Sequence, residues 1–211
     1  MKIAAPKTAN NLPKHSFHDV QLEEELELYD CQIIDDEFES EQLDHIRIST
    51  AHIKNSNLIG SSFSKADFLD VTFENCDLSN VHLDGSNIHR VHFKNCKLLG
   101  VNFTDVRFGN VTFEQCIGNL SVFSQSKFDK VRFVECELKQ TDFYDCTFKS
   151  IEFEQCNINE ANLEETKLAK VDLSSCTFET LTVGLNSLKG CTVSAQQAAL
   201  LASLMGLIVK H

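Results

Sequence analysis

Cysteine, histidine and carboxylate side chains are the residues of this sequence that could carry chemistry. The chain has 211 residues, with nine Cys, eight His and 31 Asp plus Glu. Clustered Cys and His would suggest a metal centre, paired Cys a disulfide framework, and paired carboxylates general acid–base catalysis. Each of these sites needs its own spacing, so the spacing of these residues decides between them.

The cysteines have the spacing of core residues rather than of ligands. Their number is odd and no Cys-x-x-Cys occurs, which disfavours a zinc site and a disulfide framework. Residues 1–14 contain no apolar segment after Lys2 and Lys7, so no signal peptide is predicted and we expect a reducing, cytoplasmic location. We interpret all nine as small buried side chains with free thiols: Cys31, Cys76, Cys96, Cys116, Cys136, Cys146, Cys156, Cys176 and Cys191.

The remaining polar residues match no catalytic pattern. His89 and His92 form a His-x-x-His, but they fall on adjacent outer sides of the repeat described below and therefore diverge. No nucleophile elbow, zinc-protease or phosphate-loop motif is present. Regularly spaced acids on a repeat are typical of a solvated face and imply no concave pocket. We expect no catalytic residue, metal, cofactor or small-molecule substrate.

A five-residue period organises the chain. From Leu28 to Val193, every fifth residue is Leu, Ile, Val or Phe, with Gly118 the one exception among 34 positions. Fifteen of the 16 Phe residues lie at these positions, and only Phe17 does not. The residues two places earlier are uncharged from position 46 to 191, with Asn186 the polar outlier. Neither a helix nor a simple strand has this period, so the chain must turn a corner in every repeat.

A period of twenty lies on top of the period of five. Val, Phe and Cys each recur at this spacing, as at Cys76, Cys96 and Cys116. Twenty is four fives, which predicts four sides per coil, with like side chains stacked about 4.8 Å apart. The missing side chain of Gly118 predicts a local distortion at residues 116–121.

These units resemble those of the pentapeptide-repeat family, whose unit reads approximately Ala-Asp/Asn-Leu-x-x. The matching units include Ala66-Asp67-Phe68, Cys76-Asp77-Leu78, Val101-Asn102-Phe103, Thr141-Asp142-Phe143 and Ala161-Asn162-Leu163. The resemblance covers residues 28–193 and implies an all-β solenoid, a right-handed quadrilateral β-helix of about eight and a half coils. Such a rod is about 40 Å long.

The two ends of the repeat region need caps, because an open coil exposes core and unpaired backbone. Residues 1–27 form the N-terminal segment, and the acid-rich stretch from Asp19 to Asp44 contains twelve acids and no Lys or Arg. Asp36 and Glu41 place charges in the small inward position, which predicts a flattened first coil or a cap.

Residues 194–211 are predicted to form a C-terminal helix and a short strand. Ser194 and Gln197 form a capping box that opens a helix extending to Met205, and Gly206 ends it. The segment is too apolar for a simple cap, and we favour a cap that is also a homodimer interface. The interface residues we expect are Leu200, Leu201, Leu204, Met205, Leu207 and Val209.

Charge is sorted by side of the predicted rod. The net charge of −12 disfavours nucleic acid as a partner and favours a basic one. The side that contains Phe103 has a net charge of −6 and the next side +6, with −4 and −2 on the others. One charge per about 4 Å of rod is sparser than the one per 1.7 Å of duplex DNA, but has the same sign. The six acids are Asp84, Asp105, Asp142, Asp145, Glu164 and Glu165.

The uninterrupted rod and the C-terminal Ser-x-x-Gln-Ala helix ending in Met-Gly-Leu-Ile-Val resemble the Qnr-type quinolone-resistance proteins. The resemblance implies a dimeric, non-enzymatic DNA mimic that binds DNA gyrase and topoisomerase IV and modulates them or protects them from fluoroquinolones. The alternative is a pentapeptide-repeat scaffold for another protein partner. Residues 198–209 are too few to span a bilayer, so we expect a soluble protein without a membrane partner.

Overall fold

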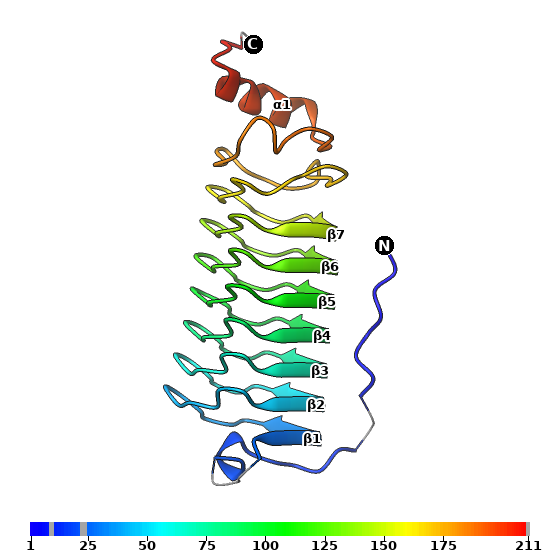
Figure 1. Ribbon diagram of the computed structural model, residues 1–211, viewed down its shortest axis with the longest axis vertical. Helices are drawn as coiled ribbons and strands as arrows, with labels where there is room; N and C mark the ends of the chain where they lie inside the picture. Colours follow the sequence, from blue (N-terminus) through cyan, green and yellow to red (C-terminus); the bar gives the residue numbers. More distant parts are fainter. Residues whose placement is uncertain (9–10, 22–24, 210–211) are drawn as a thin grey trace.

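The computed structural model describes residues 1–8, 11–21 and 25–209. Seven eight-residue strands form one sheet of parallel neighbours in chain order, and one α-helix follows them (Figure 1). The elements are η1 (Phe17–Asp19), β1 (Glu27–Ile34), β2 (Arg47–Lys54), β3 (Asp67–Glu74), β4 (Asn87–Lys94), β5 (Arg107–Glu114), β6 (Lys127–Val134), β7 (Thr147–Glu154), α1 (Ala195–Ala202) and η2 (Ser203–Met205).

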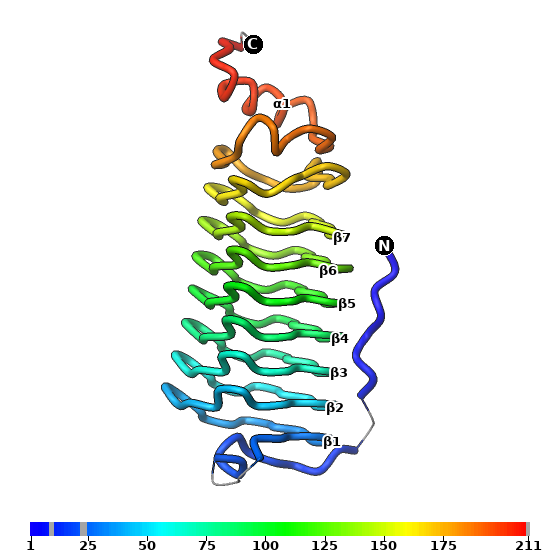
Figure 2. The backbone as a smooth tube through the Cα atoms, viewed as in Figure 1, coloured from blue at the N-terminus to red at the C-terminus, as the bar shows by residue number. Residues whose placement is uncertain are grey.

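From β1 to β6, each coil of the chain contains twenty residues and stacks in register on the coil before it. Val91 of β4 pairs with Val111 of β5, and Phe93 with Phe113. The two sides without strands are joined by single bridges at the same interval, such as Asn102 to Val122. The tube trace shows the resulting stack of similar coils (Figure 2). This arrangement confirms the four-sided β-helix that the repeat predicts.

The corners of the coil are left-handed residues. Between Asp30 and Lys170, every fifth residue has a positive φ, with Ser150 the single exception in this fully described range. Asn and Asp tolerate this conformation better than other non-glycine residues, and Asn55, Asn75 and Asn95 stand at such corners. The corner residues therefore permit a turn every five residues without interrupting the stack.

The two inward positions of each repeat form the core. Phe93 and Phe113 stack with their ring centroids 4.8 Å apart and their planes at 4°, and Phe113 and Phe133 repeat this at 4.6 Å and 5°. Each buried Phe contributes about 2 kcal/mol by removing apolar surface from water. Eight of the nine cysteines are buried beside this ladder, and Cys96 Sγ donates to the carbonyl of Phe73 at 3.5 Å. The interpretation of Cys as a small core residue is confirmed.

The coil at Gly118 is regular, so the predicted distortion there is wrong. Gly118 N–H donates to Glu137 O at 2.7 Å, as Leu98 N–H does to Ile117 O. Ile117 and Leu120 remain about half exposed instead of turning inward. A Cβ on Gly118 would lie 3.0 Å from Leu138 Cδ2, so Leu138 of the next coil occupies the space that the missing side chain leaves.

We therefore expect Leu138→Ala to be more destabilising than the same change at Leu78, whose neighbouring coils carry full side chains. Loss of Leu138 should cost about 3–5 kcal/mol, about 1 kcal/mol more than Leu78→Ala, because Gly118 enlarges the cavity. Urea unfolding measures both. Adding Gly118→Ala should raise the free energy of unfolding of the Leu138→Ala variant but not that of wild type. An equal effect of Gly118→Ala in both backgrounds would contradict the contact between Leu138 and Gly118.

The N-terminal end of the solenoid is closed by Phe17, the one Phe outside the period. Its side chain is buried, with its ring 5.2 Å from that of Phe38. Asp36 accepts hydrogen bonds from Ser16 Oγ at 2.9 Å and from Phe17 N–H at 2.9 Å, and Glu41 accepts one from Gln21 at 3.0 Å. The two charges in the small position thus bind the cap, so of the two predicted outcomes the structure has the cap.

Residues 1–8 run along the outside of the strands, away from the cap (Figure 1). Lys7 N–H donates to Asp70 at 2.9 Å, Ala4 N–H to Asn110 at 3.1 Å, and the Met1 amine to Glu152 at 2.5 Å. Three extended residues span about 10 Å and two coils about 9.6 Å. Because the two spacings match, one contact forms at every third residue and every second coil.

Asn110→Gly should loosen this segment without unfolding the rod, because Gly keeps the left-handed corner and removes the acceptor. Loss of one hydrogen bond predicts roughly 2- to 10-fold faster hydrogen exchange at the Ala4 amide. Asn95→Gly is the matched control, since that corner also has a positive φ and its side chain forms no hydrogen bond with residues 1–8. Similar exchange in both variants would show that Asn110 does not hold the segment.

Gln197 closes the C-terminal end. It forms the predicted capping box with Ser194, and its buried amide donates to the carbonyls of Leu173 and Cys176, both at 2.8 Å. The helix is shorter than predicted, since α1 ends at Ala202 and a 3-10 turn continues to Met205, where the left-handed Gly206 ends it. Residues 207–209 form no strand, which corrects the prediction for the described part of the tail.

Candidate functional site

The six candidate acids lie on one side of the solenoid. We call this the acidic side: residues 81–85, 101–105, 121–125, 141–145 and 161–165. Each segment is joined to the next by a β-bridge, and together these bridges hold the segments in one row. The bridged residues, in order, are His82, Asn102, Val122, Asp142 and Asn162. Four coil steps separate its first and last segments, a distance of about 19 Å.

The acids of the acidic side differ from the other acids in their partners. Elsewhere, acids such as Asp70, Asp77 and Glu152 form ion pairs with Arg90, Lys97 and Arg132. Within the described residues, none of the six acids of the acidic side has a cationic group within 4.0 Å. The negative charge of this side is therefore not neutralised by direct contacts within the chain.

The six acids fall into two groups by their contacts. Asp142 accepts hydrogen bonds from Ser124, Asn162 and Tyr144 N–H, at 2.7, 2.9 and 3.0 Å, and Asp84 accepts one from Ser64 at 2.8 Å. These two acids support the coil structure. The other four are exposed: Asp105, Asp145, Glu164 and Glu165. Three of these stand at left-handed corners with their side chains directed at solvent, and they are free to contact a partner.

The acidic side is interrupted at its centre. The segment 121–125 has no acid, so Asp84 and Asp105 are separated from the other four carboxylates. Tyr144, which was not among the residues expected from the sequence, lies between Asp142 and Asp145 and is 41% exposed. A half-exposed Tyr among acids is typical of an interface residue, and its outward position in the repeat was the available signal.

The neighbouring side carries the opposite charge. Arg90 and Lys149 of this side pair with Asp70 and Asp129, at 2.6 Å each. Five cations have no acid within 4.0 Å among the described residues: Arg107, Lys127, Lys130, Lys167 and Lys170. An acidic row and a basic row thus run side by side along the rod. A partner that binds the acidic row must therefore either contact the basic row favourably or stay clear of it.

The candidate dimer residues are mostly exposed. Leu201 packs against the core, whereas Leu200, Leu204 and Met205 are 40%, 41% and 63% exposed. Leu207 and Val209 are exposed as well. One end of the rod therefore presents a contiguous apolar segment to water, which is the feature expected of an association surface.

Cysteine and histidine chemistry is limited by burial. All nine thiols are free, and burial raises the pKa of the Cys31 and Cys176 thiols to about 11. Burial, then the positive charge of Arg90, lowers the pKa of His89, which lies against Gly109, while His92 pairs with Glu114 at 2.9 Å. Within the described ranges, no three His, Cys, Asp or Glu residues group as a metal site.

The thiols predict a loss of stability in alkali. An unfolded thiol has a pKa near 8.5, so between about pH 8.5 and 11 the unfolded chain binds fewer protons than the folded one. Stability is therefore complete below pH 8.5 and falls as the pH rises towards 11. Cys176→Ala should reduce the slope of the unfolding free energy by up to about 1.4 kcal/mol per pH unit. Urea midpoints at pH 7, 9 and 10 measure this, and an unchanged slope would contradict a buried, protonated Cys176.

The fold places the chain among the parallel β-solenoids built from five-residue repeats. Three family models match it: the pentapeptide repeat region at residues 86–163, and pentapeptide repeats of nine and eight copies at residues 51–97 and 148–180. The chain belongs to the pentapeptide-repeat family. Within the described ranges, no helix has the length and hydropathy that a membrane span requires.

Solved structures of pentapeptide-repeat proteins are similar to this chain, and the likeness to HetL shows the same fold. The crystal structure of HetL, a pentapeptide-repeat protein involved in heterocyst differentiation regulation in the cyanobacterium Nostoc, is 13% identical, with 81% of this chain and 86% of HetL covered and a TM-score of 0.55. A trypsin-treated variant of QnrB1, a plasmid-mediated fluoroquinolone resistance protein, is 18% identical, with 94% and 95% covered and a TM-score of 0.45. No curated protein matches the sequence.

Proposed function

We propose that this protein is a non-enzymatic DNA mimic that binds type II topoisomerases, DNA gyrase and topoisomerase IV, and modulates them or protects them from fluoroquinolones. The observation that carries the proposal is the row of carboxylates on the acidic side, none of which forms an ion pair within the described chain. A row of free anions on a rigid rod can occupy a basic surface that otherwise binds DNA phosphates.

The geometry of the acidic side supports this proposal. Its exposed carboxylates are held at multiples of the coil spacing of about 4.8 Å, so the rod presents its charge with little loss of conformational freedom on binding. The attraction between exposed charges is screened over about 8 Å at physiological ionic strength. We therefore expect binding to gyrase that weakens steeply with salt.

The C-terminal segment supports a two-fold form of the mimic. The Ser-x-x-Gln-Ala helix and the Met-Gly-Leu-Ile-Val that follows are the residues that resemble the Qnr-type proteins. We infer that the exposed apolar residues of α1 and of the tail form a homodimer. Two rods joined at this end would offer two acidic sides along about 80 Å to a partner that is itself two-fold.

A supercoiling assay tests the proposal. The purified protein should alter the supercoiling activity of DNA gyrase, or restore it in the presence of ciprofloxacin, at micromolar concentration. The protein alone should not retard duplex DNA in a gel, because its net charge is −12. No effect on gyrase or topoisomerase IV, with or without the drug, would refute the topoisomerase target, and retardation of DNA would assign function to the basic row.

The second candidate is a scaffold that binds another protein. The observation that favours it is the unbroken stack of strands from β1 to β7, which leaves no inserted loop outside this part of the rod. HetL, which shares the fold, is involved in the regulation of heterocyst differentiation. A chain that is inert towards both topoisomerases but forms a saturable complex with a different protein would establish this function instead.

A further inference from the structure

The stack of coils opens directly after β7, on the two sides that the strands occupy. In lower coils, Thr147 N–H donates to Ser126 O and Glu135 N–H to Glu154 O, both at 2.9 Å. No backbone hydrogen bond joins residues 147–154 to residues 167–174, all of which the structure describes, whereas Asn157 and Asn162 on the other two sides still bridge to the next coil. The outer edge of β7 therefore forms no backbone hydrogen bond with the next coil, and only near its end does a side chain reach it, where Ser175 Oγ donates to Phe153 O at 3.3 Å.

Two changes at this level account for the opening. Ser150 is the one corner between Asp30 and Lys170 without a positive φ, and the pairing of β6 with β7 shifts register there, from Asp129 to Ser150. In the next coil, Val171 N–H donates to Leu168 O at 3.0 Å, which closes a tight turn where the lower coils have an extended strand. The tighter turn draws that coil away from β7.

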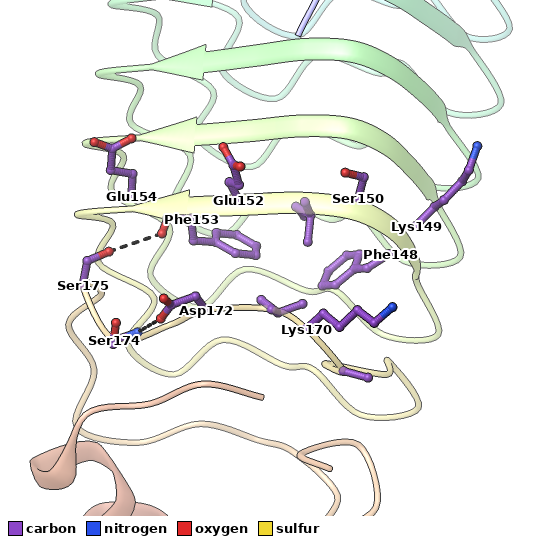
Figure 3. A pocket seen from close by; sticks show the side chains of 13 residues that line it. Phe148, Lys149, Ser150, Glu152, Phe153, Glu154, Lys170, Asp172, Ser174 and Ser175 are labelled. Atoms are coloured by element: carbon purple, nitrogen blue, oxygen red, sulfur yellow. Dashed lines mark hydrogen bonds between the residues drawn. The ribbon is translucent and has the colours of Figure 1, made fainter. Parts of the chain in front are cut away.

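Side chains show the same opening. Phe108 and Phe128 are stacked at 24°, whereas the ring of Phe148 lies at 89° to that of Phe128 and is partly exposed. Between β7 and the following coil lies a cleft of about 540 Å³ (Figure 3). Phe148 and Phe153 point into it from β7, so its floor is apolar.

The two ends of the cleft have opposite charges. Lys149 and Lys170 lie at one end, and Glu154 and Asp172 lie towards the other (Figure 3). Glu152 is already paired with the Met1 amine and Arg132, so Glu154 and Asp172 supply the uncompensated negative charge. Lys149 is likewise paired with Asp129, so Lys170 supplies the uncompensated positive charge. Five residues separate Lys149 from Glu154, about 16 Å along an extended strand.

We propose that this cleft binds an extended peptide of a partner protein as an added strand on the free edge of β7. The peptide carries an acidic residue at the lysine end, apolar residues over Phe148 and Phe153, and a basic residue at the end of Glu154 and Asp172. An unpaired strand edge is a template for such addition, with main-chain hydrogen bonds giving affinity and side-chain positions giving specificity. In the all-parallel sheet the acid precedes the base along the peptide. This inference does not depend on the topoisomerase target.

Binding of synthetic peptides to the full chain tests the proposal. The probe is fluorescein-labelled Glu-Val-Thr-Val-Lys with blocked ends, and anisotropy should show saturable binding. The reversed-charge peptide Lys-Val-Thr-Val-Glu should bind at least roughly 10-fold more weakly, because both end charges then meet like charges. N-methylation of the central Thr amide should weaken the probe by a similar factor, since it removes a strand hydrogen bond.

A charge-swapped variant provides the decisive control. Lys170 and Glu154 are exposed and form no ion pair in the described chain, so Lys170→Glu with Glu154→Lys should fold normally by circular dichroism. This variant should prefer the reversed-charge peptide. No saturable binding of any peptide, unchanged preference in the folded variant, or equal binding of the N-methylated probe would each overturn the proposal.

Hydrogen exchange identifies a competing occupant. With the probe bound, amides of β7 should exchange more slowly, whereas those of β4 should not change. If β7 is instead protected without peptide, in proportion to protein concentration, and Ile208→Asp removes the protection, the edge is occupied by the exposed tail of a second copy. That result would overturn the assignment to a foreign peptide.

Discussion

Neutralising the exposed corner acids, by Asp105→Asn, Asp145→Asn and Glu165→Gln together, is expected to weaken binding to DNA gyrase by roughly 3- to 150-fold. Each exposed charge contact contributes about 0.2–1 kcal/mol, and three act together here. The melting temperature should stay nearly constant, because these three side chains form no hydrogen bond or ion pair within the described chain and Asn and Gln retain their size. Gyrase binding is measured by surface plasmon resonance at two salt concentrations.

A control with the same net charge separates the acidic side from charge in general. Glu135→Gln, Glu160→Gln and Glu179→Gln also remove three charges, but from other sides of the rod. This variant should bind gyrase within about 3-fold of wild type, since distant charges are screened. Equal weakening in both variants would indicate a non-specific effect of net charge, and no weakening in the first would remove the acidic side from the mechanism.

The fold could be predicted from the sequence because every repeat has the same pattern of inward-facing residues. A large residue such as Phe113 and a small one such as Val111 must both point inward, and no charged residue can replace either in the regular coils. The twenty-residue interval then aligns the rows, which is how the six acids could be assigned to one side before the structure. Their role as a binding surface stays a prediction.

The irregular coil could not be located from the apolar pattern. Gly118 breaks that pattern, yet its N–H donates to Glu137 O of the next coil and its carbonyl accepts from Ser121 N–H, as in the other coils, and Leu138 fills the gap. Ser150 leaves the pattern intact, since Phe148 and Phe153 are still five residues apart, but it lacks the left-handed corner. A count of apolar positions reports which side chains point inward and carries no information about φ.

The ends of the rod depend on single polar contacts that cannot be predicted from the repeat pattern. Asp36 looked like a defect in the small position, and it proves to accept hydrogen bonds from Ser16 and Phe17 of the cap. The sequence predicts Gln197 in a capping box. Its side-chain amide also donates hydrogen bonds to the carbonyls of Leu173 and Cys176, and these contacts become visible only once the coil is folded. Asn186, expected inward, is exposed where the last coil loosens.

Leu204→Glu with Met205→Glu is expected to convert a C-terminal homodimer into a folded monomer that no longer affects gyrase. Both side chains are exposed in the single chain, at 41% and 63%, so their replacement costs little within the protomer. Burying two or three such side chains per chain contributes roughly 3–6 kcal/mol before the cost of association. Two buried carboxylates per chain would more than remove that contribution.

Light scattering with circular dichroism, followed by the supercoiling assay, measures both parts of this prediction. Leu69→Glu with Leu99→Glu is the matched control, because these leucines are each 40% exposed and lie on the rod, away from α1. The control should remain dimeric and active. A wild-type monomer at micromolar concentration, or a double variant of α1 that stays dimeric, would place the interface elsewhere. A folded monomeric variant as active as wild type would show that one acidic side suffices, and that the two-fold symmetry of the topoisomerase is not what the rod recognises.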